Sequence, residues 1–145
     1  MRQAICLLAN PDALPAIERL RGLFPRTRVV IDHFARIGMD GTIRTTDLDN
    51  LCRLAALPQV FVKTSAFYAL GRKQAPYLDL APMIRRLRDA FGAERLMWGS
   101  DCPYQVEHGH TYAASLALIR DRLDFLTAEE KKWVLRKTAQ TVYWI

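Results

Sequence analysis

Cysteine is scarce in this chain, and long apolar runs are missing from it. The 145 residues include three cysteines, Cys6, Cys52 and Cys102, which lie far apart and never in CxxC spacing. An odd number of separated cysteines argues against a disulfide framework and favours reduced thiols, so we expect a cytoplasmic protein. No apolar stretch approaches the ~20 residues that a membrane span requires, and the first residues lack the pattern of a signal peptide. We therefore expect no membrane partner.

A glycine-rich phosphate loop and a concentrated basic arm are also missing. Without the loop, a small open-sheet phosphate or nucleotide binder is disfavoured. The formal net charge is +6, from 21 basic and 15 acidic residues, but the basic residues are scattered among carboxylates along the chain. We therefore expect no nucleic-acid partner. The excess positive charge fits small anionic ligands or solvated helix faces equally well.

What the chain does contain is a repeated alternation of strand and helix patterns. Apolar runs predict strands over residues 2–9, 28–33, 60–65 and 95–98. A segment with apolar residues at helical spacing follows each strand. These segments carry Leu14, Ile17, Leu20 and Phe24; then residues 48–57 with Asp47 as N-cap; then Leu80, Ile84, Leu87 and Phe91; then Leu116, Ile119, Leu123 and Leu126. Units of ~30 residues predict parallel strands with right-handed crossovers.

The end of the chain predicts one more helix. Thr127 and Glu130 have the spacing of a capping box, in which each side chain satisfies a free amide at the helix start. This helix is expected to run past Trp133 toward the C-terminus. Because no linker or low-complexity segment interrupts the chain, we expect a single domain over residues 1–145.

Polar side chains stand at the ends of three predicted strands: His33, Lys63 with Ser65, and Asp101. The carboxyl ends of parallel strands meet at one edge of a sheet, so we expect these groups to converge on one mouth. There Asp101 would accept a proton from water, and His33 would polarise a carbonyl or ligate a divalent metal. The missing side chain at Gly99 would leave room for a substrate. The competing interpretation of Asp101 is a helix N-cap or a turn residue.

These strand ends carry a family resemblance. Residues 30–33 (Val-Ile-Asp-His), 62–65 (Val-Lys-Thr-Ser), 95–103 (Arg-Leu-Met-Trp-Gly-Ser-Asp-Cys-Pro) and 138–140 (Thr-Ala-Gln), with Tyr143, resemble the C-terminal half of the amidohydrolase-related (amidohydrolase 2) family of TIM-barrel metal-dependent hydrolases. That family includes lactonases and related decarboxylases. The resemblance implies an α/β fold, the parallel (βα)4 half of a TIM barrel plus a C-terminal helix, with the four strands as the fifth to the eighth.

The resemblance also implies an activity and its residues. It implies a hydrolase acting on a lactone or a related ester or amide bond of a small, carboxylated substrate. Asp101 corresponds to the family's general base, which is also a ligand in metal-dependent members. His33 corresponds to the histidine that contacts the substrate carbonyl or the activated water. Arg36 would meet a substrate carboxylate through its bidentate fork, and its competing interpretation is a solvated loop charge.

Three further residues are candidates for substrate binding. Lys63 either lines the mouth or points outward toward the helices, and Ser65, two residues on, shares its side of the strand. His110 follows the strand of Asp101 and is placed to reach the mouth. We do not interpret His108 and His110 as a metal pair, because a glycine-containing loop does not fix two imidazoles as a strand does.

The chain also departs from the family pattern. The family's first strand carries a His-x-His pair with no counterpart before Ala9, the first strand here ends in Asn10 without a histidine, and the usual terminal Asn-Ala is Thr138-Ala139. A whole barrel takes ~250 residues, so we expect a fragment of a longer enzyme that is inactive without its N-terminal half. A divalent metal such as zinc, held by Asp101 and His33, and metal-independent action are both compatible with the sequence.

A second function remains open beside the hydrolase. The chain is alternatively a catalytically inert half-barrel that binds small anions through Arg36 and Lys63 or assembles with another chain. Four strands cut from a closed barrel leave two unpaired edges and an uncovered apolar face. We therefore expect a homodimer or another association through these edges, or a poorly folded isolated chain.

Overall fold

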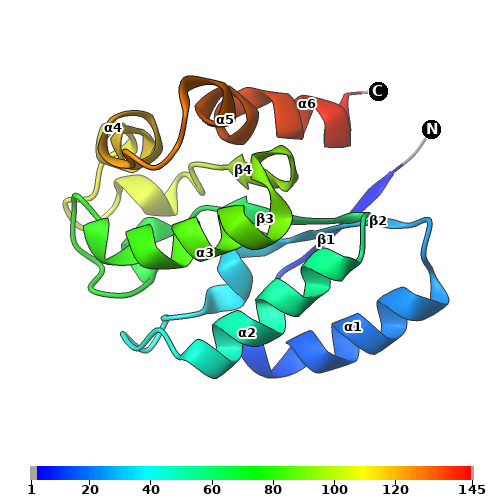
Figure 1. The fold of residues 1–145 in the computed structure, drawn as a ribbon. Coiled ribbons are helices and arrows are strands. Elements are labelled where there is room, and N and C mark those ends of the chain that lie inside the picture. The colour runs from blue at the N-terminus through cyan, green and yellow to red at the C-terminus, as the bar shows by residue number, and fades with distance from the viewer. Residues whose placement is uncertain (1–2, 145) are drawn as a thin grey trace.

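A parallel four-stranded sheet forms the centre of the molecule. The computed structural model describes residues 3–144, and the predicted strand start at Arg2 lies outside the described residues. The strands are β1 (Ala4–Leu7), β2 (Arg28–Ile31), β3 (Val60–Thr64) and β4 (Leu96–Trp98), paired in the order β1-β2-β3-β4 (Figure 1). Every pair is parallel. The predicted fold class, a (βα)4 half-barrel with a C-terminal helix, is confirmed.

Helices and short turns connect the strands. The 3-10 turns are η1 (Pro11–Ala13), η2 (Asp32–Arg36), η3 (Leu54–Ala56), η4 (Phe67–Ala69), η5 (Leu78–Leu80), η6 (Ala93–Arg95) and η7 (Tyr104–Val106). The α-helices are α1 (Leu14–Leu23), α2 (Thr45–Arg53), α3 (Ala81–Phe91), α4 (Tyr112–Ala117), α5 (Ala128–Lys132) and α6 (Thr138–Tyr143). Two π-helical turns, η8 (Leu118–Arg122) and η9 (Trp133–Lys137), continue α4 and join α5 to α6.

The two faces of the sheet pack against different helices. Alternate strand residues such as Ile31 and Val62 pack with the apolar sides of α1, α2 and α3 in the main core. The other face carries Val30, Phe61 and Met97, which form a second cluster with Val142 of α6. This face, which we call the inner face, is therefore partly covered by the C-terminal helix α6 (Figure 1).

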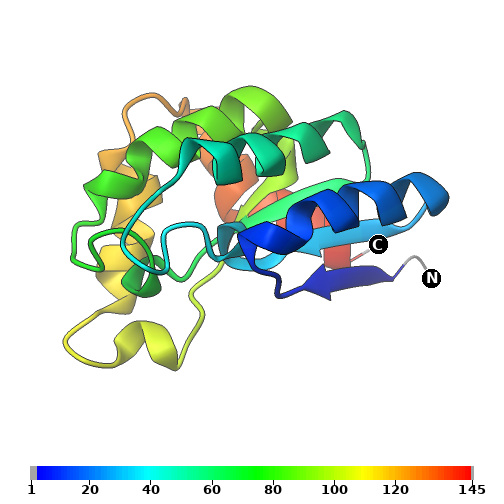
Figure 2. The same ribbon diagram turned by 90° about the horizontal axis from the view of Figure 1, so that it is seen from below.

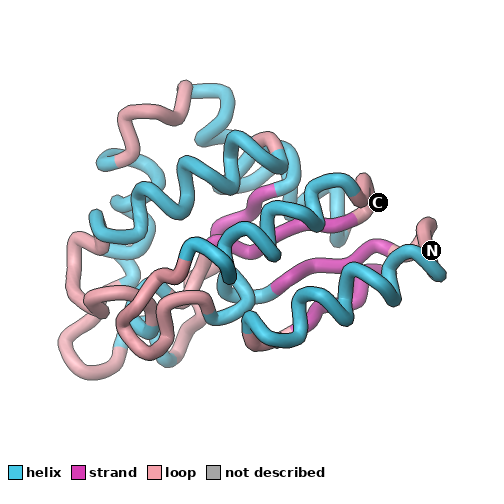
Figure 3. Tube along the Cα trace, turned by 60° about the horizontal axis from the view of Figure 1, so that its bottom comes forward, coloured by secondary structure: helices cyan, strands magenta, loops and turns pink. Residues whose placement is uncertain are grey.

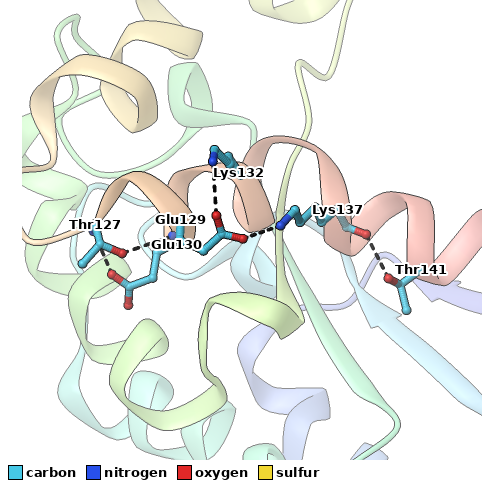
Figure 4. Close-up of polar contacts among 6 residues, drawn as sticks. All are labelled: Thr127, Glu129, Glu130, Lys132, Lys137 and Thr141. Carbon is cyan, nitrogen blue, oxygen red and sulfur yellow. Dashed lines mark hydrogen bonds and ion pairs between the residues drawn. The ribbon is translucent and has the colours of Figure 1, made fainter.

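The capping box at the start of α5 is present as predicted. The Glu130 amide donates to Thr127 Oγ1 at 3.2 Å, and the Thr127 amide donates to Glu130 Oε2 at 2.8 Å (Figure 4). In the same first turn, Glu129 pairs with both Lys132 and Lys137. Two satisfied amides and these ion pairs define where the last helical segment begins.

Several predicted helix details are wrong. Helix α2 begins earlier than predicted, with Arg44 at the N-cap. Asp47 lies in its first turn, where the negative charge interacts favourably with the helix dipole. The helix after Tyr112 ends at Arg122, so Leu126 is buried from a loop and not from a continuous stripe.

The predicted stripe of α1 is also wrong in its outer half. Leu20 and Phe24 are 57% and 62% exposed. Because β1 is an edge strand and α1 lies beside it (Figure 2), no element formed by residues 3–144 covers the outer side of this helix. These side chains line a cavity of about 340 Å³, which we call the β1–α1 groove. Its lining comprises Ile5, Leu7, Ile17, Leu20, Arg21, Phe24, Thr27 and Val29.

Within residues 3–144, no helix combines the length and the apolar character needed to cross a membrane.

Candidate active site

Long loops gather at the carboxyl ends of the strands (Figure 3). At these ends the backbone turns sharply. Residues 33–36, directly after β2, have φ between 52° and 58°, and Asp101, shortly after β4, has φ 58°. Non-glycine residues in this left-handed region cost roughly 1–2 kcal/mol each, and such conformations concentrate at functional sites. The turns, and not the alternation of a strand, therefore aim the side chains of His33 and Asp101.

His33 and Asp101 face each other at this edge. His33 Nε2 lies 3.5 Å from Asp101 Oδ1, and the two side chains are 17% and 22% exposed. Ser65 Oγ lies 2.7 Å from His33 Nδ1. The Tyr68 hydroxyl donates to Asp101 Oδ2 at 2.7 Å. Each member of the pair is thus held from behind by a hydroxyl, and His33 Nε2 and Asp101 Oδ1 remain directed toward each other.

The surroundings of His33 favour the neutral imidazole. Burial lowers the pKa of His33 most strongly, the carboxylates of Asp101 and Asp32 oppose this effect, and the cations of Lys63 and Arg36 add to it. A neutral ring carries one proton. If Ser65 donates to Nδ1, that proton is on Nε2, where it faces Asp101 and the cavity.

Tyr68 is held as a hydrogen-bond donor. Burial raises the pKa of Tyr68, and the hydrogen bond to Asp101 raises it further. The phenol therefore keeps its proton and stabilises one oxygen of the carboxylate.

A cavity of about 360 Å³ opens in front of the pair, which suits a small ligand. Its lining comprises Leu8, His33, Arg36, Met39, Ala66, Tyr68, Ala69, Leu70, Asp101 and Tyr104. Arg36 donates to Asn10 Oδ1 at 3.3 Å, and it forms no ion pair within the described residues. Its charge is therefore available to an anion in the cavity.

Lys63 does not line this cavity. It points to the inner face, where its Nζ lies 2.5 Å from Asp32 Oδ1, so the outward orientation toward the helices is wrong. The space at Gly99 is also already filled, because a Cβ there would lie 3.3 Å from Lys63 Cδ. The expectation that Gly99 leaves room for a substrate is therefore wrong, since the stem of Lys63 occupies that room.

His110 and Ser65 lie behind the cavity lining. His110 Nδ1 is 2.8 Å from the Tyr77 hydroxyl, and its ring lies beside that of Tyr68. Ser65 is fully buried, so it contacts His33 but cannot contact a substrate. The structure therefore brings neither residue to the position of a substrate contact, while His108 is 90% exposed beside Glu107.

Tyr68 is the main site residue that the sequence analysis did not identify. It lies three residues after Ser65, in the loop that follows the carboxyl end of β3. A tyrosine in the loop after such a strand end was the available signal, since loops at this edge carry functional side chains. Leu8, Met39 and Tyr104 complete the wall from other loops.

The described residues do not by themselves fit a catalytic zinc ion. His33 and Asp101 are two suitable ligands, and residues 3–144 contain no cluster of three or more histidine, cysteine, aspartate or glutamate side chains. Catalytic zinc sites use three protein ligands and an open position. One carboxylate oxygen of Asp101 is moreover occupied by Tyr68.

Comparisons with known proteins agree on one family. The profile of the family described as Amidohydrolase matches residues 7–145. The L-fucono-1,5-lactonase of Burkholderia ambifaria is 36% identical over 112 residues, covering 76% of this chain and 39% of that protein. The 4-sulfomuconolactone hydrolase of Rhizobium radiobacter is 30% identical over 95 residues, covering 65% of this chain and 31% of that protein.

A solved structure confirms the fold. The crystal structure of an amidohydrolase from Burkholderia multivorans with bound zinc superposes with a TM-score of 0.83 and 26% identity, over 95% of this chain and 51% of that chain. This chain therefore spans about half the length of that structure, and its matches cover less than half of the two curated relatives.

Proposed function

Because the chain belongs to the amidohydrolase family, we propose that it forms the catalytic edge of a hydrolase that opens a lactone or a related ester bond. The observation that carries the proposal is the pair of His33 Nε2 and Asp101 Oδ1, 3.5 Å apart beside a cavity of small-ligand size. The two curated relatives are named for lactone hydrolysis, which supports the same bond type.

Asp101 is the general base of the proposed reaction. Tyr68 stabilises Oδ2, so Oδ1 is the oxygen that takes a proton from a water molecule in the cavity. The oxygen of that water bonds to the lactone carbonyl carbon. When the ring C–O bond breaks, the leaving oxygen takes the proton back from Asp101. The products are a carboxylic acid and an alcohol, and Asp101 returns to its ionised form.

His33 polarises the carbonyl in this reaction. With Ser65 donating to Nδ1, the proton on Nε2 points to the space beside Asp101 Oδ1. A substrate carbonyl oxygen in that space would receive this hydrogen bond, which strengthens as negative charge develops in the transition state. A neutral imidazole also avoids a permanent ion pair that would compete for Asp101.

Arg36 selects for anionic substrates in this proposal. Its guanidinium lines the cavity without a carboxylate partner among the described residues, and it is suited to bidentate contact with a carboxylate or a sulfonate. The substrate class is thus a small lactone with an acidic substituent. The relative named for a sulfonated lactone supports this class.

The test is a hydrolysis assay with the purified chain. The panel contains L-fucono-1,5-lactone, 4-sulfomuconolactone and a carboxylated lactone, and acid release is followed with a pH indicator. We expect hydrolysis that Asp101→Asn lowers by about 10³-fold, within the range of general-base removal. Hydrolysis that is equal in both proteins would contradict the proposal.

The inert half-barrel is the second candidate, and one observation favours it. No three potential zinc ligands cluster within the described residues, and the cavity offers two, His33 and Asp101, so an activity that needs zinc requires further groups. Lys63 is engaged with Asp32, so anion binding in this alternative rests on Arg36. If no lactone is hydrolysed while sulfomuconolactone still binds and Asp101→Asn leaves its affinity unchanged, this second function replaces the first.

A further inference from the structure

A buried polar cluster lies directly behind the Asp101–Tyr68 contact. Gln105 and Tyr77 are 0% and 1% exposed. The Gln105 side-chain amide donates to the Tyr77 hydroxyl and to the Thr111 carbonyl, each at 3.2 Å. The backbone amide of Gln105 also donates to the Asp101 carbonyl at 3.2 Å. One buried residue therefore connects the backbone of the proposed base to the loop of residues 66–77.

His110 completes the connection to Tyr68. Its ring stacks on Tyr77 with centroids 5.9 Å apart and an interplanar angle of 25°. Its centroid is also 6.0 Å from that of Tyr68, with an interplanar angle of 58°. The imidazole is therefore close to both tyrosine rings and limits the positions that the Tyr68 ring can take.

The protons of the cluster can be assigned from its acceptors. A carbonyl accepts only, so the Gln105 atom beside the Thr111 carbonyl is the amide nitrogen, and it also donates to the Tyr77 oxygen. The Tyr77 proton is then free to point to His110 Nδ1, 2.8 Å away. Gln105, Tyr77 and His110 thus form one directed chain of hydrogen bonds.

We propose that Gln105, Tyr77 and His110 are positioning residues that hold Asp101 and Tyr68 in their contact. The inference rests on the proposed function, in which Asp101 is the base. Gln105 holds the backbone of Asp101 in its left-handed conformation, and His110 with Tyr77 holds the Tyr68 ring so that its hydroxyl stays on Oδ2. Oδ1 then remains the carboxylate oxygen that faces His33. His110 has this role in place of a substrate contact.

Tyr77→Phe tests the cluster by removing a single oxygen atom. We expect kcat to fall about tenfold, because a small misplacement of a catalytic group is costly, while KM changes by less than about twofold. Tyr112→Phe is the matched control, because Tyr112 is 46% exposed, packs on Trp98 and lies outside the cluster. It is expected to leave both constants unchanged. An unchanged kcat in Tyr77→Phe, or a KM effect alone, would overturn the positioning role.

A second measurement does not depend on activity. The chain is labelled with ¹³Cζ-tyrosine, the Tyr68 resonance is assigned with Tyr68→Phe, and Asp101→Asn gives its position without the carboxylate acceptor. We expect Tyr77→Phe to move the Tyr68 resonance toward that position, and a resonance that stays at the wild-type shift would refute the inference. Because this readout needs no substrate, failure of the lactone assay and failure of the positioning role give different results.

Discussion

The carboxyl edge of the sheet and the β1–α1 groove differ in almost every physical respect. At the carboxyl edge, His33 and Asp101 are mostly buried, and each accepts or shares a hydrogen bond with a hydroxyl behind it. In the groove, Leu20 and Phe24 are more than half exposed, and the lining is almost wholly apolar. The first region is held together by polar contacts among the described residues, whereas the second is an uncovered apolar surface.

The candidate catalytic groups and the uncovered apolar surface therefore lie in different parts of the half-barrel. The contacts of His33 and Asp101 are made by residues that follow β2, β3 and β4, and none of them uses a side chain of β1 or α1. The groove lies along the free side of β1, and a solved relative with the same fold is about twice as long. We infer that the half-barrel itself fixes the His33–Asp101 contact, whereas burial of the groove requires association through the barrel edge.

The largest effect in this comparison is expected from a substitution at the carboxyl edge of the sheet. His33→Gln removes the group proposed to polarise the carbonyl, and we expect kcat/KM for a lactone to fall by about 10²-fold, as for loss of one oxyanion donor. His108→Gln is the matched control, because His108 is 90% exposed in a loop outside the cavity. Equal activity in the two variants would remove His33 from the mechanism.

The next largest effect is expected from substitutions in the β1–α1 groove. We propose that the purified chain self-associates through this edge, which sedimentation velocity can measure. Leu20→Lys with Phe24→Lys should weaken that association by about 10- to 100-fold, since burying such a side chain contributes roughly 1.5–3 kcal/mol. Leu78→Lys, at a side chain that is 49% exposed and outside the groove, should leave it unchanged. A compact monomer at all concentrations would refute this proposal.

A smaller effect is expected at the end of β3, where two neighbouring hydroxyl side chains can be compared. Thr64 and Ser65 are neighbours and both fully buried, but Thr64 Oγ1 has no hydrogen-bond partner in the part of the chain that the structure describes. Thr64→Val removes this unpaired hydroxyl, so the free energy of unfolding should rise by about 1 kcal/mol in urea titration. Ser65→Ala removes the contact to His33 and should instead lower kcat severalfold. A loss of stability in Thr64→Val would show that its hydroxyl is satisfied.

The smallest effect is a pH dependence of stability at the polar edge. Burial places the folded pKa of His33 below its unfolded value of about 6.5. As pH falls through that value, the unfolded chain binds the proton more readily, so the free energy of unfolding decreases. The decrease between about pH 7.5 and pH 5 should be smaller in His33→Gln than in His108→Gln. An equal decrease in both variants would assign it to other groups.

Much of the fold could be predicted because it depends on local patterns. The strand order follows from βα periodicity, and the capping box at Thr127 follows from two residues in contact with each other's amides. Leu20 and Phe24 were misjudged because helical spacing identifies an apolar side, and it does not show whether another element covers that side. Asp47 was misjudged because the helix begins at a residue without a capping side chain.

Only the site residues at the strand ends could be predicted from the sequence. His33 and Asp101 follow from the convergence of parallel strands, and the structure places them 3.5 Å apart. Tyr68 could not be assigned in this way, because its contact with Asp101 depends on the path of a loop with residues in the left-handed region. The contact of His110 with Tyr77 depends on two loops packing together, which no local spacing specifies.

The contact between Gly99 and Lys63 constrains how this site can diverge. A Cβ at position 99 would lie 3.3 Å from Lys63 Cδ, so the lysine stem, which is held by Asp32, would have to move by a few tenths of an ångström. Related chains that carry a larger residue at position 99 should therefore carry a shorter one at position 63, and should lose the acid at position 32 with it. The volume at position 99, the length of the side chain at position 63 and the charge at position 32 are therefore expected to change together, although none of the three lines the cavity.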